Sequence, residues 1–180
     1  EISVDYDGDP VREFVPYTAY VLSVPKETPF TPNHLSKPSN TLYLSSPADA
    51  VRSVRVSKYY LSGGHYRVDV SFEKAEQEEF IKEYRLIFIP NPSPGEIILQ
   101  KMNATEEKNY IVQKPEGGPV TLSLYADQLK DWKGNPLNGK HPYILCVLSV
   151  ADGITTTENA LSEPSNAFHL LTPVQPVRSV

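Results

Sequence analysis

The chain repeats its own sequence at a constant spacing of 126 residues. Residues 1–54 align with residues 127–180 without a gap, and 22 of the 54 aligned pairs are identical. The clearest matches are PYTAYVLSV with PYILCVLSV, NHLSKPSN with NALSEPSN, and the two copies of VRSV. A spacing kept without insertions indicates tandem duplication, in which each copy corresponds to one structural unit.

The repeat predicts how the chain is divided. One complete unit is expected over residues 47–173, with residues 1–46 as the C-terminal half of a preceding unit. Residues 174–180 are then the first strand of a following unit. We expect this sequence to be a piece of a larger protein, cut within a unit at both ends, because half of such a unit leaves strand edges and apolar faces uncovered.

Composition and patterning predict an all-β fold. The 180 residues include 17 prolines, 11 tyrosines and 6 phenylalanines, which suit short strands and turns. Apolar and polar residues alternate over residues 66–72, as in a half-buried strand. Turn residues lie before this segment at 62–64 and further on at 90–95. A helical turn is expected only at 126–132. Seven or eight strands are predicted in the complete unit, over residues 51–56, 66–72, 81–89, 97–101, 110–113, 120–125, 143–150 and 166–171.

Many short strands separated by turns are typical of an antiparallel β-sandwich. Alternation along the strands predicts which side chains face inward. We expect ten of them to form one buried cluster between two sheets: Tyr66, Val68, Val70, Phe72, Tyr84, Leu86, Phe88, Tyr143, Leu145 and Val147.

A further pattern resembles fibronectin type III domains. Leu137 lies six residues before Tyr143, and Val11 lies six residues before Tyr17. This spacing is similar to the family's corner ahead of strand F, where a tyrosine hydroxyl bonds nearby backbone. The segments YILCVLSV and LSEPSN look like the family's strand F and the start of its strand G.

The resemblance implies a fibronectin type III-like sandwich in tandem repeats of 126 residues. Phe72 then takes the place of the family's strand-B tryptophan, and Tyr84 suits its strand-C aromatic residue. The unit is longer than usual for the family, and the tryptophan is missing. An immunoglobulin-like sandwich outside the strict family therefore stays open.

The resemblance also implies a non-catalytic structural or adhesive module. We expect it in a larger extracellular or cell-surface protein, bacterial in origin, as part of a stalk, surface layer or fibre. The alternatives are an accessory module of a secreted polysaccharide-degrading enzyme and a segment of a receptor ectodomain. Because one sandwich fold hosts many functions, the fold alone does not choose between them.

Charge and cysteine content limit the partners. The net charge of −5 is spread without a basic patch, so no nucleic acid is expected. No apolar stretch reaches the roughly 20 residues of a membrane span, so this segment is not expected to insert into a membrane.

The single cysteine, Cys146, excludes an internal disulfide. Expected partners are neighbouring repeats or other copies of the chain in a head-to-tail assembly, and no cofactor is expected.

A weak candidate for a metal site lies in the sequence DYDGDP. Asp5, Asp7 and Asp9 provide carboxylates of the kind that bind calcium. The EF-hand pattern needs a glutamate at about its twelfth position, and Pro16 stands there instead. The sister loop has Lys133 at a ligand position. We therefore interpret the sequence as a turn and predict no bound metal.

No constellation of residues indicates catalysis. The histidines are scattered without the spacing of a zinc site, and no serine has a glycine-flanked elbow. Asn103 begins a formal glycosylation acceptor, Asn-Ala-Thr. The residues considered and set aside are His34, His65, His141, His169, Ser36 and Ser162.

An apolar row on the strand over residues 143–150 is the candidate interaction site. Its members alternate with the expected core residues and should therefore face outward. Two interpretations stay open, a contact surface for a partner and a layer covered by the long connection after residues 81–89. The row consists of Thr18, Tyr20 and Leu22 in the first unit and of Ile144, Cys146 and Leu148 in the second.

Overall fold

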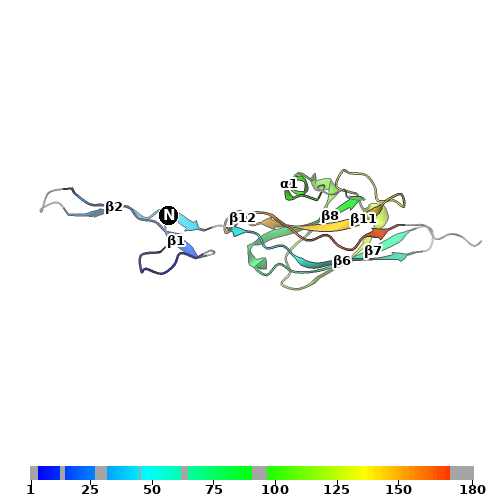
Figure 1. The fold of residues 1–180 in the computed structure, drawn as a ribbon, viewed down its shortest axis with the longest axis horizontal. Helices are drawn as coiled ribbons and strands as arrows, with labels where there is room; N and C mark the ends of the chain where they lie inside the picture. Colours follow the sequence, from blue (N-terminus) through cyan, green and yellow to red (C-terminus); the bar gives the residue numbers. More distant parts are fainter. Residues whose placement is uncertain are drawn as a thin grey trace, which may run out of the picture. The chain divides into compact units, whose positions relative to one another are not determined.

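A computed structural model describes residues 4–12, 15–26, 32–44, 46–61, 65–90 and 97–170 (Figure 1). The chain forms two compact units, Glu1–Ser46 and Pro47–Val180, which are described separately. The division falls at the residue where the complete repeat is expected to begin. The expected strand at 174–180 and the turns at 62–64 and 91–95 lie outside the described residues.

The second unit is built from antiparallel strands. One sheet has the order β10-β7-β6, and a larger sheet has the order β13-β11-β8-β9, with β14 also paired to β11. Among its described residues, four short helical segments interrupt the strands: η2 (Glu78–Phe80), α1 (Leu99–Asn103), η3 (Glu107–Asn109) and η4 (Ala126–Gln128). The strands are β5 (Ser46–Pro47), β6 (Arg52–Tyr60), β7 (Tyr66–Glu73), β8 (Ile81–Pro90), β9 (Ile111–Gln113), β10 (Val120–Tyr125), β11 (Pro142–Ala151), β12 (Thr156–Glu158), β13 (Ala160–Leu161) and β14 (Phe168–His169).

The main apolar cluster takes its members from both sheets. All ten side chains expected in the core are buried in it, so that prediction is confirmed. Phe72 of β7 meets Tyr84 of β8 edge to face, with ring centroids 5.5 Å apart. Burial of such alternating apolar faces is the main driving force that holds the two sheets together.

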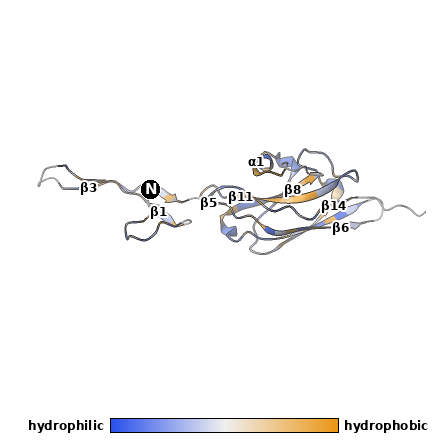
Figure 2. Cartoon of the chain, in the orientation of Figure 1, coloured by the Kyte–Doolittle hydropathy of each residue, from blue (hydrophilic) through white to orange (hydrophobic). Residues whose placement is uncertain are grey.

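Strand β11 is buried on both faces. Its inward side chains belong to the main cluster, while Ile144, Cys146 and Leu148 belong to a second cluster with Ile87 of β8. A strand covered on both sides needs apolar residues at nearly every position, which explains the continuous run YILCVLSV. Figure 2 shows β8 and β11 as hydrophobic strands.

The prediction of a strand over residues 97–101 is wrong. The structure has helix α1 (Leu99–Asn103) there, lying over β8 and β11 (Figure 1). Leu99, Gln100, Lys101 and Met102 all favour helix, and Met102 is fully buried in the second cluster. A short apolar run does not distinguish strand from helix by its period alone. No helix within the described ranges is long and apolar enough to cross a membrane.

Two further differences and one agreement concern the last third of the unit. Strands β12 and β13 are not predicted by the sequence, because they are only three and two residues long, too short to show alternation. The strand expected over residues 166–171 is shorter in the structure, where β14 covers Phe168–His169. The helical turn allowed at 126–132 is present as η4.

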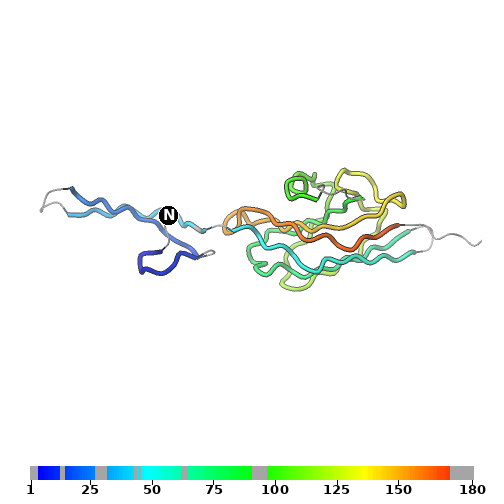
Figure 3. Tube along the Cα trace, in the orientation of Figure 1, coloured from blue at the N-terminus to red at the C-terminus, as the bar shows by residue number. Residues whose placement is uncertain are grey.

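The first unit contains one long hairpin. Strand β1 (Pro16–Thr18) pairs with β4 (Thr41–Tyr43), and β2 (Leu22–Ser23) pairs with β3 (His34–Leu35). Each pairing recurs 126 residues later, since Leu22 faces Leu35 as Leu148 faces Leu161. In Figure 3 the described residues of this unit trace the two arms of the hairpin and the loop that precedes it.

We predict that Phe72→Ala lowers the free energy of unfolding of the second unit by about 3–5 kcal/mol, because a buried aromatic ring is removed from a packed cluster. Urea unfolding followed by tyrosine and tryptophan fluorescence measures the change. Tyr125→Ala is the matched control, since the Tyr125 side chain is about half exposed. Equal losses in the two variants would show that the register of β7 is wrong.

Candidate interaction surface

Each unit has a tyrosine whose hydroxyl accepts a hydrogen bond from nearby backbone. The amide of Asn138 donates to the Tyr143 hydroxyl at 3.0 Å, and the amide of Arg12 donates to the Tyr17 hydroxyl at 2.9 Å. The two contacts are 126 residues apart. The arrangement ties the turn before the strand to the strand itself.

The aspartate loops are held by their own backbone. Oδ1 of Asp5 accepts bonds from the amides of Asp7 and Asp9, both at 3.0 Å. Asp131 accepts the same pair of bonds in the second unit, from the amides of Lys133 and Asn135 at 2.9 Å. These contacts support the interpretation as a turn, and no group of three potential metal ligands occurs among the described residues. The absence of a bound ion stays a prediction.

Two serines of the LSEPSN segment bond strand β11 through their side chains. Ser162 Oγ accepts from the amide of Val147, and Ser165 Oγ accepts from the amide of Leu145, both at 2.9 Å. Each serine also donates its own amide to the carbonyl of the same partner. The hydroxyls satisfy strand amides beside a segment that contains a proline, which has no amide hydrogen to donate.

The first unit repeats these serine contacts. Ser36 Oγ accepts from the amide of Val21 at 2.9 Å, and Ser39 Oγ accepts from the amide of Ala19 at 3.0 Å. The Ser36 hydroxyl donates to the Lys37 carbonyl. The side chains of Ser36 and Ser162 are therefore bonded to backbone rather than to a histidine.

The candidate row is covered in the second unit. Ile144, Cys146 and Leu148 are buried against Met102 of helix α1, with Trp132, Tyr110 and other side chains packed around them. The row faces away from the main cluster, as expected, and it is covered because helix α1, in the connection between β8 and β9, lies over this face. The second of the two interpretations describes this unit.

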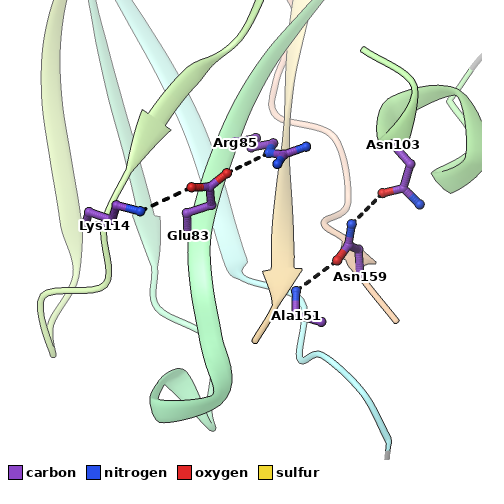
Figure 4. Close-up of polar contacts among 6 residues, drawn as sticks. All are labelled: Glu83, Arg85, Asn103, Lys114, Ala151 and Asn159. Atoms are coloured by element: carbon purple, nitrogen blue, oxygen red, sulfur yellow. Dashed lines mark hydrogen bonds and ion pairs between the residues drawn. The ribbon is translucent and has the colours of Figure 1, made fainter. Parts of the chain in front are cut away.

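The same face of β8 is polar nearer the start of the strand, where Glu83 and Arg85 lie (Figure 4). The carboxylate of Glu83 accepts from Arg85 Nε at 2.9 Å and from Lys114 Nζ at 3.2 Å. Burial acts to raise the pKa of Glu83, but the bonds and positive charges of Arg85 and Lys114 outweigh it and leave the pKa lowered. The pair therefore stabilises the ionised form of Glu83 in the folded unit.

An asparagine ladder fixes helix α1 to the end of β11 (Figure 4). The amide of Ala151 donates to Asn159 Oδ1 at 2.9 Å, and Asn159 Nδ2 donates to Asn103 Oδ1 at 2.8 Å. Asn103, the candidate glycosylation acceptor, is exposed at the last residue of the helix. The ladder keeps α1 over the apolar row.

The candidate row is open in the first unit. Tyr20 and Leu22 are 53% and 56% exposed, whereas their counterparts Cys146 and Leu148 are fully buried. The opposite face of the strand is open as well, since Val21 is 68% exposed. The apolar strand of the first unit is therefore exposed on both faces, in contrast to its counterpart β11.

A hollow opens on the same hairpin. Its lining includes Asp5 and Tyr6 from the loop and Ala19 and Leu42 from the hairpin strands. Thr18 and Tyr20 of the candidate row also line it. The first unit therefore combines an apolar strand with an adjoining depression.

The histidines do not converge. His34 lies exposed in β3, and His169 lies half-buried in β14. His65 lies 3.7 Å from the carboxylate of Asp127, and both side chains are largely exposed. His141 is exposed before β11. Sequence reasoning missed the paired serines as structural residues, although their place in both copies of the repeat was visible.

We predict that Glu83→Gln destabilises the second unit at pH 7 and that its difference from the parent chain shrinks on acidification. The folded pKa of Glu83 lies below its unfolded value, so its stabilisation is present above about pH 4.3 and is lost as the pH falls through the folded pKa. Urea unfolding at pH 7 and pH 3 tests this. Glu107→Gln, at an exposed position, is the control. A difference from the parent that stays constant with pH would contradict the prediction.

We predict that Cys146 does not react with iodoacetamide at pH 8 in the folded chain. Burial, and to a smaller extent the carboxylate of Glu163, raise the pKa of the Cys146 thiol to about 12. Thiolate is the reactive form, and the side chain is inaccessible. Mass spectrometry should show alkylation only after denaturation.

The matched control is Tyr20→Cys in a Cys146→Ala background, because Tyr20 is the exposed counterpart of Cys146. This thiol should react promptly in the folded chain. Similar rates for the two thiols would contradict the difference in burial between the units.

No protein-family model, curated protein or solved structure matches the chain. The resemblance to fibronectin type III repeats therefore rests on the sequence.

Proposed function

We propose that the chain is part of a non-catalytic array of β-sandwich repeats, each of 126 residues, in a structural or adhesive protein. The observation that carries this proposal is the recurrence of the same backbone contacts at one constant spacing. The tyrosine corner, the aspartate turn, the serine bonds and the strand pairs all occur in both units. A repeat of 126 residues has the size of a domain with its own core, so successive copies would follow one another along the chain as separate domains, an arrangement that suits a spacer.

The fibronectin type III-like form of the sandwich is part of this proposal. An apolar cluster shared by two sheets supports it, as does the hydroxyl of Tyr143 bonded to the corner before its strand. The edge-to-face contact of Phe72 with Tyr84 agrees with the positions that the resemblance gives these residues.

The proposed place of the protein is the cell surface or the extracellular space of a bacterium. The side chains weighed as catalytic candidates support a structural role. Ser36 and Ser162 accept hydrogen bonds from backbone amides, and the histidines lie apart from one another. Cys146 is buried and contributes to packing. A module of this kind needs no disulfide to maintain its core in an oxidising environment.

We predict that antibodies raised against the purified chain label intact cells of the source organism.

We also predict that the parent protein, stretched by atomic force microscopy, unfolds in successive steps. Each step should lengthen the chain by no more than about 420–450 Å, the span of 126 extended residues.

Labelling only after cell lysis would contradict the surface location. A single unfolding step in the complete parent protein would contradict the array. Two results together would instead favour an accessory module of a polysaccharide-degrading enzyme. They are retention of the chain on an insoluble polysaccharide and a parent protein in which one unit lies beside a catalytic domain.

A further inference from the structure

In the described part of the chain, no strand pairs with the outer edge of β1 and β2 in the first hairpin. The amides of Ala19 and Val21 donate to the serine hydroxyls on one side of the strand. Because amides alternate in direction along a strand, those of Tyr20 and Leu22 point to the opposite edge. Their counterparts, Cys146 and Leu148, lie opposite Ile87 and Arg85 of β8.

The second unit shows what fits the hollow beside this edge. Phe88 of β8 accepts a bond from the amide of Trp132 at 2.9 Å and forms a bridge with Asp131. It lies opposite Leu145 and contacts the ring of Phe168. The counterparts of these four residues, 126 positions earlier, are Tyr6, Asp5, Ala19 and Leu42, and all four line the hollow.

Asn40 lies where a second contact with an added strand would form. Its counterpart Asn166 accepts from the amide of Val56 at 3.0 Å and donates to the Val56 carbonyl at 2.9 Å. Asn166 thereby joins the segment just before β14 to β6 of the other sheet. Asn40 is exposed, and among the described residues its side chain has one long contact, with the neighbouring Thr41 carbonyl at 3.5 Å.

A second copy of the chain is a poor source of these strands. In every copy β8 is already paired with β11, and β6 is already bonded to Asn166. If a copy lent its β8 and β6 to another hairpin, its own residues 127–170 would lose the same partners. Exchange between copies therefore leaves one uncovered hairpin for every chain.

We propose that the first unit is an acceptor for two strands with the chemistry of β8 and β6. They belong to a segment similar to residues 47–126 that precedes it on the same polypeptide. A β8-like strand pairs with the open edge and places an aromatic side chain in the hollow, while a β6-like strand bonds the amide of Asn40. This inference rests on the repeat organisation proposed above.

The test is an extended chain that carries a second copy of residues 47–126 directly before Glu1. Residue 127 is the counterpart of Glu1, so this junction keeps the natural spacing. Hydrogen exchange of the Tyr20 and Leu22 amides should be fast in the 180-residue chain and at least roughly 100-fold slower in the extended chain. Phe88→Asp in the added copy alone should abolish this protection and leave the second unit intact.

Asparagine variants provide a matched second readout. Asn166→Ala should lower the melting temperature of the second unit in both chains. Asn40→Ala should have no effect in the 180-residue chain and should lower the melting temperature of the first unit in the extended chain.

Two results would overturn the proposal. One is fast exchange at Tyr20 and Leu22 in the extended chain. The other is slow exchange in the 180-residue chain, with light scattering then showing whether a second copy or the chain itself covers the hairpin. Failure of surface labelling with slow exchange in the extended chain would remove the proposed location and keep the acceptor.

Discussion

The pairing of β8 with β11 is the interaction on which the second unit depends. These two strands supply inward side chains to the cluster shared by both sheets and outward side chains to the cluster under α1. Each of the remaining elements covers or extends this pair. The other sheet closes the inner face, α1 closes the outer face, and the serine-bearing segment occupies the free edge of β11.

The two units separate local from long-range causes of structure. The tyrosine corner, the aspartate turn and the serine bonds form in the first unit even though its strand faces are exposed. The tyrosine corner and the aspartate turn join residues at most five positions apart, while the serine bonds link the two arms of one hairpin, 15 and 20 positions apart. All of them form within the hairpin and the loop before it, without a second sheet. Burial of the apolar row needs strands and a helix from elsewhere, and only the second unit has them in the described structure.

The core could be predicted from the sequence because alternation assigns side chains to faces, as for residues 66–72. The cover of the outer face could not, since it depends on where the connection after β8 folds back. The same connection contained the error at residues 97–101, where a short apolar run forms a helix over Cys146. The bonds that Ser162 and Ser165 make to β11 could not be predicted either. Their hydroxyls replace backbone acceptors, and this role has no periodic signal.

The order of the strands has a kinetic consequence. β11 is central in its sheet, yet it follows β8 by more than fifty residues, so the contact that holds the unit together closes a long loop. Such non-local pairing makes folding slow. In the proposed array, a newly made β8 would be exposed before its own β11 exists, while the preceding unit presents a similar strand, PYTAYVLSV against PYILCVLSV. Misassembly between adjacent repeats is the characteristic error of such proteins. Rapid completion of each unit, before the next β8 is made, is therefore a condition for correct folding of the array.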